Sequence, residues 1–288
     1  MVKAAQDGMT VDILPLVSSV NQQIALVLPG SSIKGALRSQ AERIIRTVCK
    51  ISLTQDTEGK QRFLEQVQVP LVETLFGIAA KQQPEIQEED LQKCNYKPGL
   101  SALSVDDCYN VQKIEPKKWQ SVTDATNSQE LRTALNNTPI KQTQQAFHVA
   151  IDRWTGGAAD GFLYNNLEPF NIEWEDINLT LNLKRIPKSE LHATLALLLL
   201  TLRDLYAGRI PLGYGVNRGM GAIAVEKIWL HGKGLKEESL QAFEKQNVEL
   251  NFTPEGGMQI LDSEFLTSLN KHWQAWIECN RYQSEVTV

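Results

Sequence analysis

The stretch LPGSSIKGALRS at residues 28–39 constrains the fold more than any other segment, because it predicts a turn followed by a helix. The Pro29–Gly30 pair favours the turn, and Ser31 and Ser32 are residue types that cap helix N-termini. A buried stripe follows at helical spacing, formed by Ile33, Leu37, Ala41, Ile44, Ile45 and Val48. The sequence therefore predicts a helix over residues 33–50.

This predicted helix is basic, although the chain as a whole carries a formal net charge of -5, which argues against indiscriminate nucleic-acid binding. Against one acid, Glu42, residues 31–50 hold the basic side chains Lys34, Arg38, Arg43, Arg46 and Lys50. Lys34 and Arg38 lie four residues apart, so both project from one helical face. Free amides at a helix N-terminus also bind phosphate. The sequence indicates an anion-binding surface, with a capped surface helix of solvated charges as the alternative.

Three later segments complete the predicted core. Residues 146–183 alternate as strands in FHVAID, FLYNNL and INLTLNL, and WTGGAADG forms a hairpin tip or a longer loop between the first two. A leucine-rich helix is expected over residues 190–207, capped by Ser189 and ended by Gly208. The glycine-rich turn GYGVNRGMG then leads into a strand at residues 222–230. This order predicts an α+β fold of the ferredoxin-like or RNA-recognition type.

We expect the whole chain, residues 1–288, to form a single domain. Its core is predicted in two stretches, residues 10–50 and 146–230. Residues 51–145 are rich in Gln, Asn, Lys and acids, and are interpreted as an irregular insertion with one or two helices. Residues 231–288 are interpreted as a helical extension, with a packing helix over residues 263–279.

Cysteine usage and hydropathy restrict the compartment. The four cysteines form neither a disulfide framework nor close C-x-x-C pairs, which favours free thiols in a reducing cytosol. The longest apolar run, Leu195–Leu200, is too short to cross a bilayer, and no signal peptide is recognised. We therefore expect a cytoplasmic protein that has no membrane partner.

Two further motifs are candidates for nucleic-acid contacts. In LGYGVNRGMGAIAVE, glycines surround Asn217 and Arg218, and such a loop can wrap around a phosphate backbone; a tight turn with an exposed arginine is the alternative. In HVAIDRWTGGAADG, Arg153 and Trp154 follow a strand, so the ring can stack on a base or ribose. The alternative there is a hairpin with a surface ion pair between Asp152 and Arg153.

Taken in this order, the three motifs resemble the RAMP superfamily (repeat-associated mysterious proteins) of CRISPR effector subunits. LPGSSIKGALRS is similar to the family's first-helix signature, IDRWTGGAADGFLY to the strand entering the thumb hairpin of type III backbone subunits, and GYGVNRGMGAIAV to the C-terminal glycine-rich loop. The resemblance covers residues 10–50 and 146–230. It implies a modified RNA-recognition fold with an inserted thumb hairpin, in a type III (Csm/Cmr-like) subunit that forms a filament along a guide RNA.

The resemblance also implies which residues bind RNA and which residue cuts it. The implied RNA-binding residues are Gly30, Ser31, Ser32, Lys34, Arg38, Arg153, Trp154, Gly215, Asn217, Arg218 and Gly219. In the type III branch, a loop aspartate upstream of PGSS is associated with metal-dependent cutting of target RNA; Asp12 occupies the matching place, with Asp7 as the fallback. A divalent ion, magnesium or manganese, would stabilise the charge that develops when a ribose 2′-oxygen attacks the adjacent phosphate.

The implied partners are guide RNA, target RNA and other CRISPR effector subunits. Three functions stay open: an endoribonuclease subunit that cuts with Asp12, a structural backbone subunit that holds RNA without cutting, and a nuclease that processes guide precursors. The third is disfavoured because the sequence places no catalytic histidine near a tyrosine or lysine. The chain also departs from the family at its start, since no strand ending in a glycine-containing turn is visible before Asp12.

Overall fold

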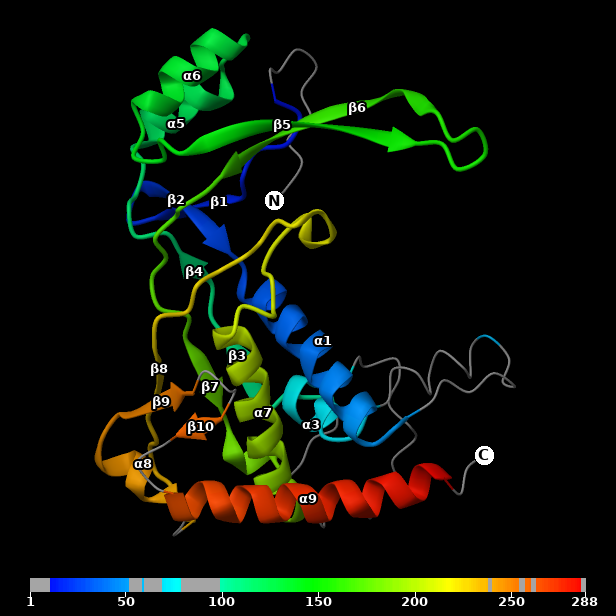
Figure 1. The fold of residues 1–288 in the computed structure, drawn as a ribbon. Helices are drawn as coiled ribbons and strands as arrows, with labels where there is room; N and C mark the ends of the chain where they lie inside the picture. Colours follow the sequence, from blue (N-terminus) through cyan, green and yellow to red (C-terminus); the bar gives the residue numbers. More distant parts are fainter. Residues whose placement is uncertain are drawn as a thin grey trace. The chain divides into compact units, whose positions relative to one another are not determined.

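The computed structural model describes residues 11–51, 59, 69–78, 99–237, 240–253, 257–259 and 263–285. They form helices and small antiparallel sheets, which confirms the predicted α+β class (Figure 1). The chain divides into two compact units: the first unit is Met1–Ser31 with Asp106–Asn178, and the second unit is Ser32–Val105 with Leu179–Val288. The described strands form sheets of two or three, and both the ferredoxin-like strand order and the single-domain organisation stay predictions.

The first unit is built around a three-stranded sheet and two helices. Its elements in chain order are β1 (Val17–Val20), β2 (Gln23–Leu28), β4 (Cys108–Tyr109), α5 (Pro116–Thr123), α6 (Ser128–Asn136), β5 (Thr143–Ile151) and β6 (Ala158–Pro169). β2 is the middle strand of the order β1-β2-β4. Leu26 of β2 packs with Trp119 of α5, Leu131 of α6 and Leu167 of β6 in one apolar core. This core anchors the base of the β5–β6 hairpin.

β5 and β6 pair antiparallel from Thr143↔Pro169 to Val149↔Leu163, and the ladder becomes irregular before Ile151. Figure 1 shows them as a long two-stranded ribbon. The structure therefore confirms the strands predicted in FHVAID and FLYNNL and the hairpin tip between them.

The predicted insertion, residues 51–145, contains α5 and α6 as well as short strands among its described residues. The acidic run at residues 85–90 and Asp7 lie outside the described residues.

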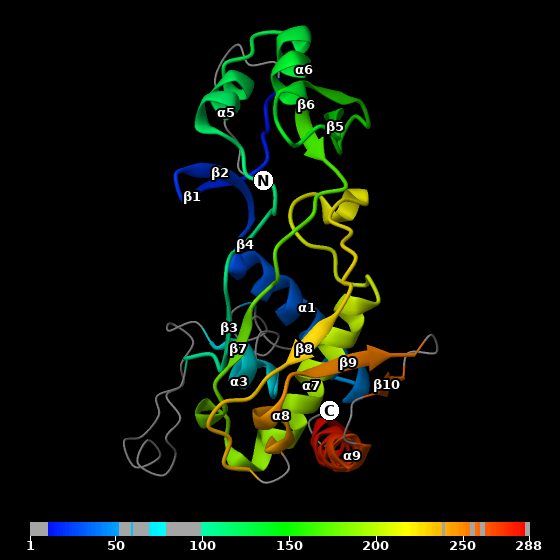
Figure 2. The same ribbon diagram turned by 90° about the vertical axis from the view of Figure 1, so that its left-hand side faces the viewer.

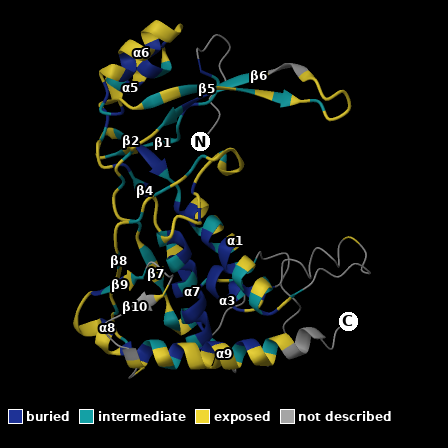
Figure 3. Cartoon of the chain, viewed as in Figure 1, coloured by how far each residue is buried: buried dark blue, intermediate teal, exposed yellow. Residues whose placement is uncertain are grey.

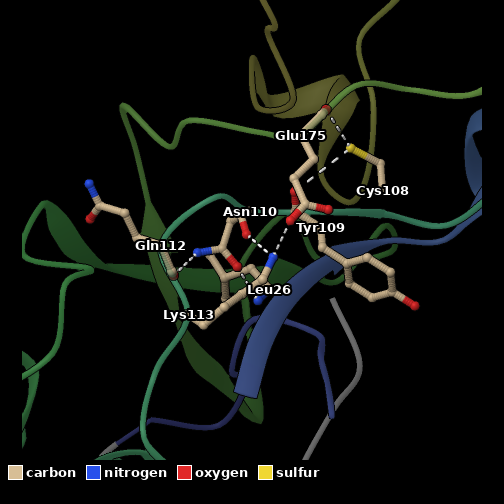
Figure 4. Close-up of polar contacts among 7 residues, drawn as sticks. All are labelled: Leu26, Cys108, Tyr109, Asn110, Gln112, Lys113 and Glu175. Carbon is tan, nitrogen blue, oxygen red and sulfur yellow. Dashed lines mark hydrogen bonds and ion pairs between the residues drawn. The ribbon is translucent and has the colours of Figure 1, made fainter. Parts of the chain in front are cut away.

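A buried asparagine ties β4 to β2 (Figure 4). Asn110 is 2% exposed; its Oδ1 accepts the Leu26 N–H at 2.7 Å, and its Nδ2 donates to the Gln112 carbonyl oxygen. Lys113 donates to the carbonyl oxygen of Asn110 and pairs with Glu175 at 2.6 Å. The side-chain oxygen and nitrogen of buried Asn110 thus both have protein partners, as burial demands.

The second unit holds the long helices. Its elements are α1 (Gly30–Val48, whose first two residues belong to the first unit), α3 (Val72–Phe76), β3 (Leu103–Val105), β7 (Leu179–Leu181), α7 (Leu191–Tyr206), β8 (Ile228–Leu230), α8 (Ala242–Lys245), β9 (Val248–Phe252), β10 (Met258–Gln259) and α9 (Ser263–Glu285), with 3-10 turns η2 (Leu183–Arg185), η3 (Lys188–Glu190) and η4 (Val216–Arg218). α7 is buried along most of its length (Figure 3), and α9 packs against it, running crosswise to α7 in Figure 1 and seen end-on in Figure 2. The predicted α9 face, Phe265, Leu269, Trp273 and Ile277, is buried.

The predicted helix starts are corrected by the structure. α1 begins at Gly30, so Ser31 and Ser32 lie in its first turn and are exposed, instead of preceding the helix. Ser189 does not cap α7 either: it lies in η3, and the N-cap residue Glu190 makes no side-chain capping bond. Serine favours the N-cap position, but in both cases the helical backbone begins before the serine, which therefore lies inside a helical turn. The predicted α7 end at Gly208 is confirmed by its left-handed φ of 69°.

The strand predicted at residues 222–230 is much shorter than expected. β8 covers Ile228–Leu230, and its ladder with β9 stops at Ile228↔Leu250. Residues 222–226 alternate between exposed and half-buried, as a strand would, but no described strand is hydrogen-bonded to residues 222–227. An alternating pattern of side chains predicts a strand, whereas a β-ladder also needs a neighbouring strand to pair with.

No helix among the described residues is both long and apolar enough to span a bilayer.

The described cysteines Cys49, Cys108 and Cys279 are free thiols, as predicted. Burial, together with the charges of Glu175 and Asp176, raises the pKa of the Cys108 thiol from 9.0 to about 11. The thiol of the unfolded chain ionises at a lower pH than the thiol of the folded chain, so the stability that this burial contributes is present below pH 9.0 and is lost as the pH rises towards 11.

At neutral pH we expect iodoacetamide to label exposed Cys279 and to spare buried Cys108 until denaturant is added, as peptide mass spectrometry would show. Equal labelling rates in the native protein would contradict this burial.

Candidate nucleic-acid interface

The N-terminus of α1 already has a carboxylate partner. The Gly30 N–H donates to Asp107 Oδ1 at 2.7 Å, so an aspartate 77 positions along the chain supplies the cap that the sequence assigned to serine. A carboxylate at this end is stabilised by the helix dipole. It also occupies one of the amides that were predicted to receive a phosphate, and the next two residues of the first turn, Ser31 and Ser32, are exposed.

One turn further along α1, the two predicted cations contact the rest of the second unit. Lys34 Nζ donates to Ser101 Oγ at 2.6 Å, and Arg38 Nη1 donates to the Gly77 carbonyl oxygen at 2.7 Å. Arg38 also pairs with Glu42, with Nε and Oε1 2.9 Å apart. Arg185 of η2 donates to the Ser101 carbonyl oxygen at 2.8 Å. The structure thus brings Lys34 together with Arg185, a residue that the sequence did not single out.

The glycine-rich loop is closed at its neck and exposed at its tip. The Leu212 N–H donates to the Gly221 carbonyl oxygen at 2.8 Å, and a side chain at Gly221 would place its Cβ 2.3 Å from the Leu212 oxygen. Gly215 and Gly219 flank η4 with left-handed φ values of 74° and 80°, a conformation that favours glycine. The residues displayed at the tip, all exposed, are Asn217, Arg218 and Gly219. The Arg218 guanidinium lies 5.9 Å from the Tyr214 ring centroid.

The tip of the β5–β6 hairpin presents an aromatic side chain to solvent. Trp154 is 97% exposed and neighbours exposed Arg153. Asp152 does not form the surface ion pair with Arg153 that was the alternative interpretation of this motif. Its carboxylate instead accepts hydrogen bonds from the Trp154 N–H at 3.0 Å and from the Thr155 hydroxyl at 2.8 Å. These hydrogen bonds to the charged form lower the pKa of Asp152. The aspartate therefore shapes the turn that displays Trp154.

Asp12 is held at the base of the same hairpin by reciprocal hydrogen bonds with Asn165 of β6. The Asn165 N–H donates to Asp12 Oδ2 at 2.8 Å, and the Asp12 N–H donates to Asn165 Oδ1 at 3.2 Å. Ile13 and Asn166 form a parallel bridge beside this pair. Asp12 is half-buried, and within the described part of the chain its Oδ1 accepts no hydrogen bond. One carboxylate oxygen is thus fixed by the backbone, which leaves the other available to a ligand.

The hairpin register also assembles a polar cluster that the sequence did not reveal. His148 and Tyr164 are cross-strand partners with ring centroids 5.3 Å apart, and His148 Nε2 lies 3.7 Å from Glu168 Oε1. Glu168 in turn accepts hydrogen bonds from Gln144 and Asn166, each at 2.8 Å. His148 and Tyr164 are 16 positions apart and meet only once the two strands pair, and the expectation that no catalytic histidine lies near a tyrosine or lysine stays a prediction.

The fold and these exposed basic elements define an α+β protein with several candidate RNA contacts. The model of the RAMP superfamily matches residues 25–224, so the chain belongs to the RAMP superfamily. The matched range contains α1, the hairpin and the glycine-rich loop, and begins after Asp12. One similar solved structure is a chain titled "CRISPR RNA-guided surveillance complex, pre-nicking", with 11% identity and a TM-score of 0.37 over 92% of this chain and 83% of that chain. No curated protein matches the sequence.

Proposed function

We propose that this chain is a guide-RNA-binding backbone subunit of a type III CRISPR effector complex. The observation that carries the proposal is membership of the RAMP superfamily over residues 25–224, which span the first-helix motif and the glycine-rich loop. The exposed Asn217 and Arg218, the exposed Trp154 and the cations of α1 are the groups that RNA-binding proteins use for phosphates and bases. Other effector subunits and a target RNA are the proposed further partners.

Cutting of the target RNA is the second part of the proposal, and it depends on Asp12. Asp12 offers one carboxylate with a fixed orientation, and magnesium is commonly bound by one or two carboxylates together with substrate phosphates. The described residues contain no cluster of three or more His, Cys, Asp or Glu side chains suited to a metal, so Asp12 fits an ion that RNA helps to hold. Such an ion, when bound, supplies charge stabilisation for attack by a ribose 2′-oxygen.

In this mechanism the chain's own residues position the reacting groups. The Asn165 N–H holds Asp12 Oδ2, so the carboxylate keeps one orientation at the base of the hairpin. Asp12 Oδ1 is then the atom that orients the ribose 2′-hydroxyl or contributes to the metal site. A backbone subunit that holds RNA without cutting is the alternative, and it predicts no cleavage at any position facing this protein.

The RNA-binding proposal is tested by removing the two cations of α1. We expect the double substitution Lys34→Ala, Arg38→Ala to weaken binding of single-stranded RNA irrespective of sequence, and to flatten the slope of log affinity against log salt by about 0.7, the value for one lost phosphate contact. Fluorescence anisotropy of a labelled guide RNA over a series of KCl concentrations measures both quantities.

The matched control for this test is Arg43→Ala, which removes one exposed cation from the same helix. We expect a smaller loss of affinity and an unchanged slope, because Arg43 is not among the predicted contacts. Circular dichroism melts verify folding, since Lys34 and Arg38 also hold Ser101 and Gly77. An unchanged slope in the folded double variant would remove this face of α1 from the RNA site.

A further inference from the structure

We propose that Lys34, Arg38 and Arg185 form one binding site for a phosphodiester group of RNA, with Arg185 as its third, unforeseen member. This inference rests on the proposed function and deepens it, because it names the group bound and the residues that hold it. The site lies within the second unit. Lys34 and Arg38 come from α1, and Arg185 comes from η2, about 150 positions later in the sequence.

The meeting point of Lys34 and Arg185 is Ser101. Lys34 Nζ donates to the Ser101 hydroxyl at 2.6 Å, and Arg185 Nη1 donates to the Ser101 carbonyl oxygen at 2.8 Å. Both partners are neutral oxygens of one residue. Two positive charges are therefore held close together, and neither carries an ion pair with any carboxylate among the described residues.

The electrostatic consequence appears at Lys34. Burial lowers the pKa of its ammonium group, and the charges of Arg38 and Arg185 lower it further. Like charges gathered in a half-buried place destabilise one another, and an anion bound among them relieves that repulsion. Among the described residues, two acids lie near the cluster: Glu42 is paired with Arg38, and burial raises the pKa of Glu73 while Arg38 lowers it. The three cations and these two acids together leave one net positive charge in the described part of the cluster.

The donor groups suit a phosphate. An ammonium group has three N–H donors and a guanidinium has five, so Lys34, Arg38 and Arg185 all keep donors beyond the hydrogen bonds described. All three side chains belong to half-buried residues, and a guanidinium fork matches two oxygens of one phosphate. A phosphodiester, with two unesterified oxygens and one negative charge, fits a site with one net positive charge.

The test compares Arg185→Gln with Lys184→Gln, using the full chain and a labelled single-stranded RNA. Lys184 is the matched control because it precedes Arg185 in η2, carries the same charge and is exposed. We expect Arg185→Gln to weaken binding about tenfold, as for one charge-assisted hydrogen bond, and to reduce the salt slope by about 0.7. Lys184→Gln should retain the wild-type slope. Glutamine removes the charge but keeps a polar N–H group, and a circular dichroism melt verifies that the variant folds.

A double-mutant cycle and a second probe make the outcome decisive. If one phosphate is shared, Arg185→Gln and Lys34→Gln should be less than additive in RNA affinity. Tripolyphosphate should raise the melting temperature of the wild-type chain and not of Arg185→Gln, a result that supports the anion site even if the chain binds no guide RNA. Arg185→Gln would overturn the site if it lowered the melting temperature while RNA affinity, salt slope and the tripolyphosphate shift stayed at wild-type values. Arg185 would then only brace Ser101.

Discussion

Replacing Asp12 with asparagine is expected to lower target-RNA cutting at least about a hundredfold at the site facing this subunit, and to leave guide and target binding unchanged. Asparagine is nearly isosteric and its side-chain oxygen can still accept the Asn165 N–H, so the local structure is retained. What is lost is the negative charge that would hold a divalent ion or orient the ribose 2′-hydroxyl. Mapping of cleavage products on a labelled target, with the assembled complex and added magnesium or manganese, measures the effect.

The control for Asp12 is Asp124→Asn, which removes an exposed carboxylate from the same unit and should cut like the wild type. Titration with magnesium separates two versions of the proposal. Rescue of Asp12→Asn by excess metal would assign the carboxylate to metal binding, and failure of rescue would assign it to orienting the hydroxyl. Cutting at the wild-type rate by Asp12→Asn would contradict both versions and favour the backbone subunit that holds RNA without cutting.

The largest expected effect on stability comes from Asn110→Ala. Its side chain accepts the Leu26 N–H and donates to the Gln112 carbonyl oxygen while 2% exposed, so alanine would leave two polar backbone groups without these partners (Figure 4). Each unsatisfied buried group costs about 1–3 kcal/mol, and we expect the free energy of unfolding to fall by about 2–4 kcal/mol. Urea denaturation followed by circular dichroism measures it.

Asn136→Ala is the matched control, because Asn136 is exposed at the end of α6 and alanine suits a helix. Its effect should stay within about 0.5 kcal/mol of zero. Two outcomes distinguish the explanations for Asn110. A loss confined to Asn110→Ala supports satisfaction of the β2 and β4 backbone by this side chain. Equal stability of Asn110→Ala and the wild type would show that the sheet provides other partners for those groups.

The sequence by itself determined the elements whose signal is local. The stripe from Ile33 to Ile45 predicts α1, and alternation around residues 147–167 predicts the hairpin, because periodic burial is written into neighbouring positions. Family membership likewise followed from motifs that are short and contiguous. Helix starts were less well predicted, since Ser31 and Ser189 have the right chemistry for caps but lie within helical turns.

Tertiary structure decided the partners of four candidate site residues, which are Asp12, Gly30, Lys34 and Arg38. Asp107 caps α1 from 77 positions away, Asn165 holds Asp12 from 153 positions away, and Ser101 joins Lys34 to Arg185. No periodicity or spacing encodes such pairs, because they depend on how the intervening chain folds back. The motif LPGSSIKGALRS therefore fixed a basic helix early in the chain. The folded second unit decided that Lys34 and Arg185 both bond to Ser101, because residues so far apart in the sequence meet only when distant segments pack.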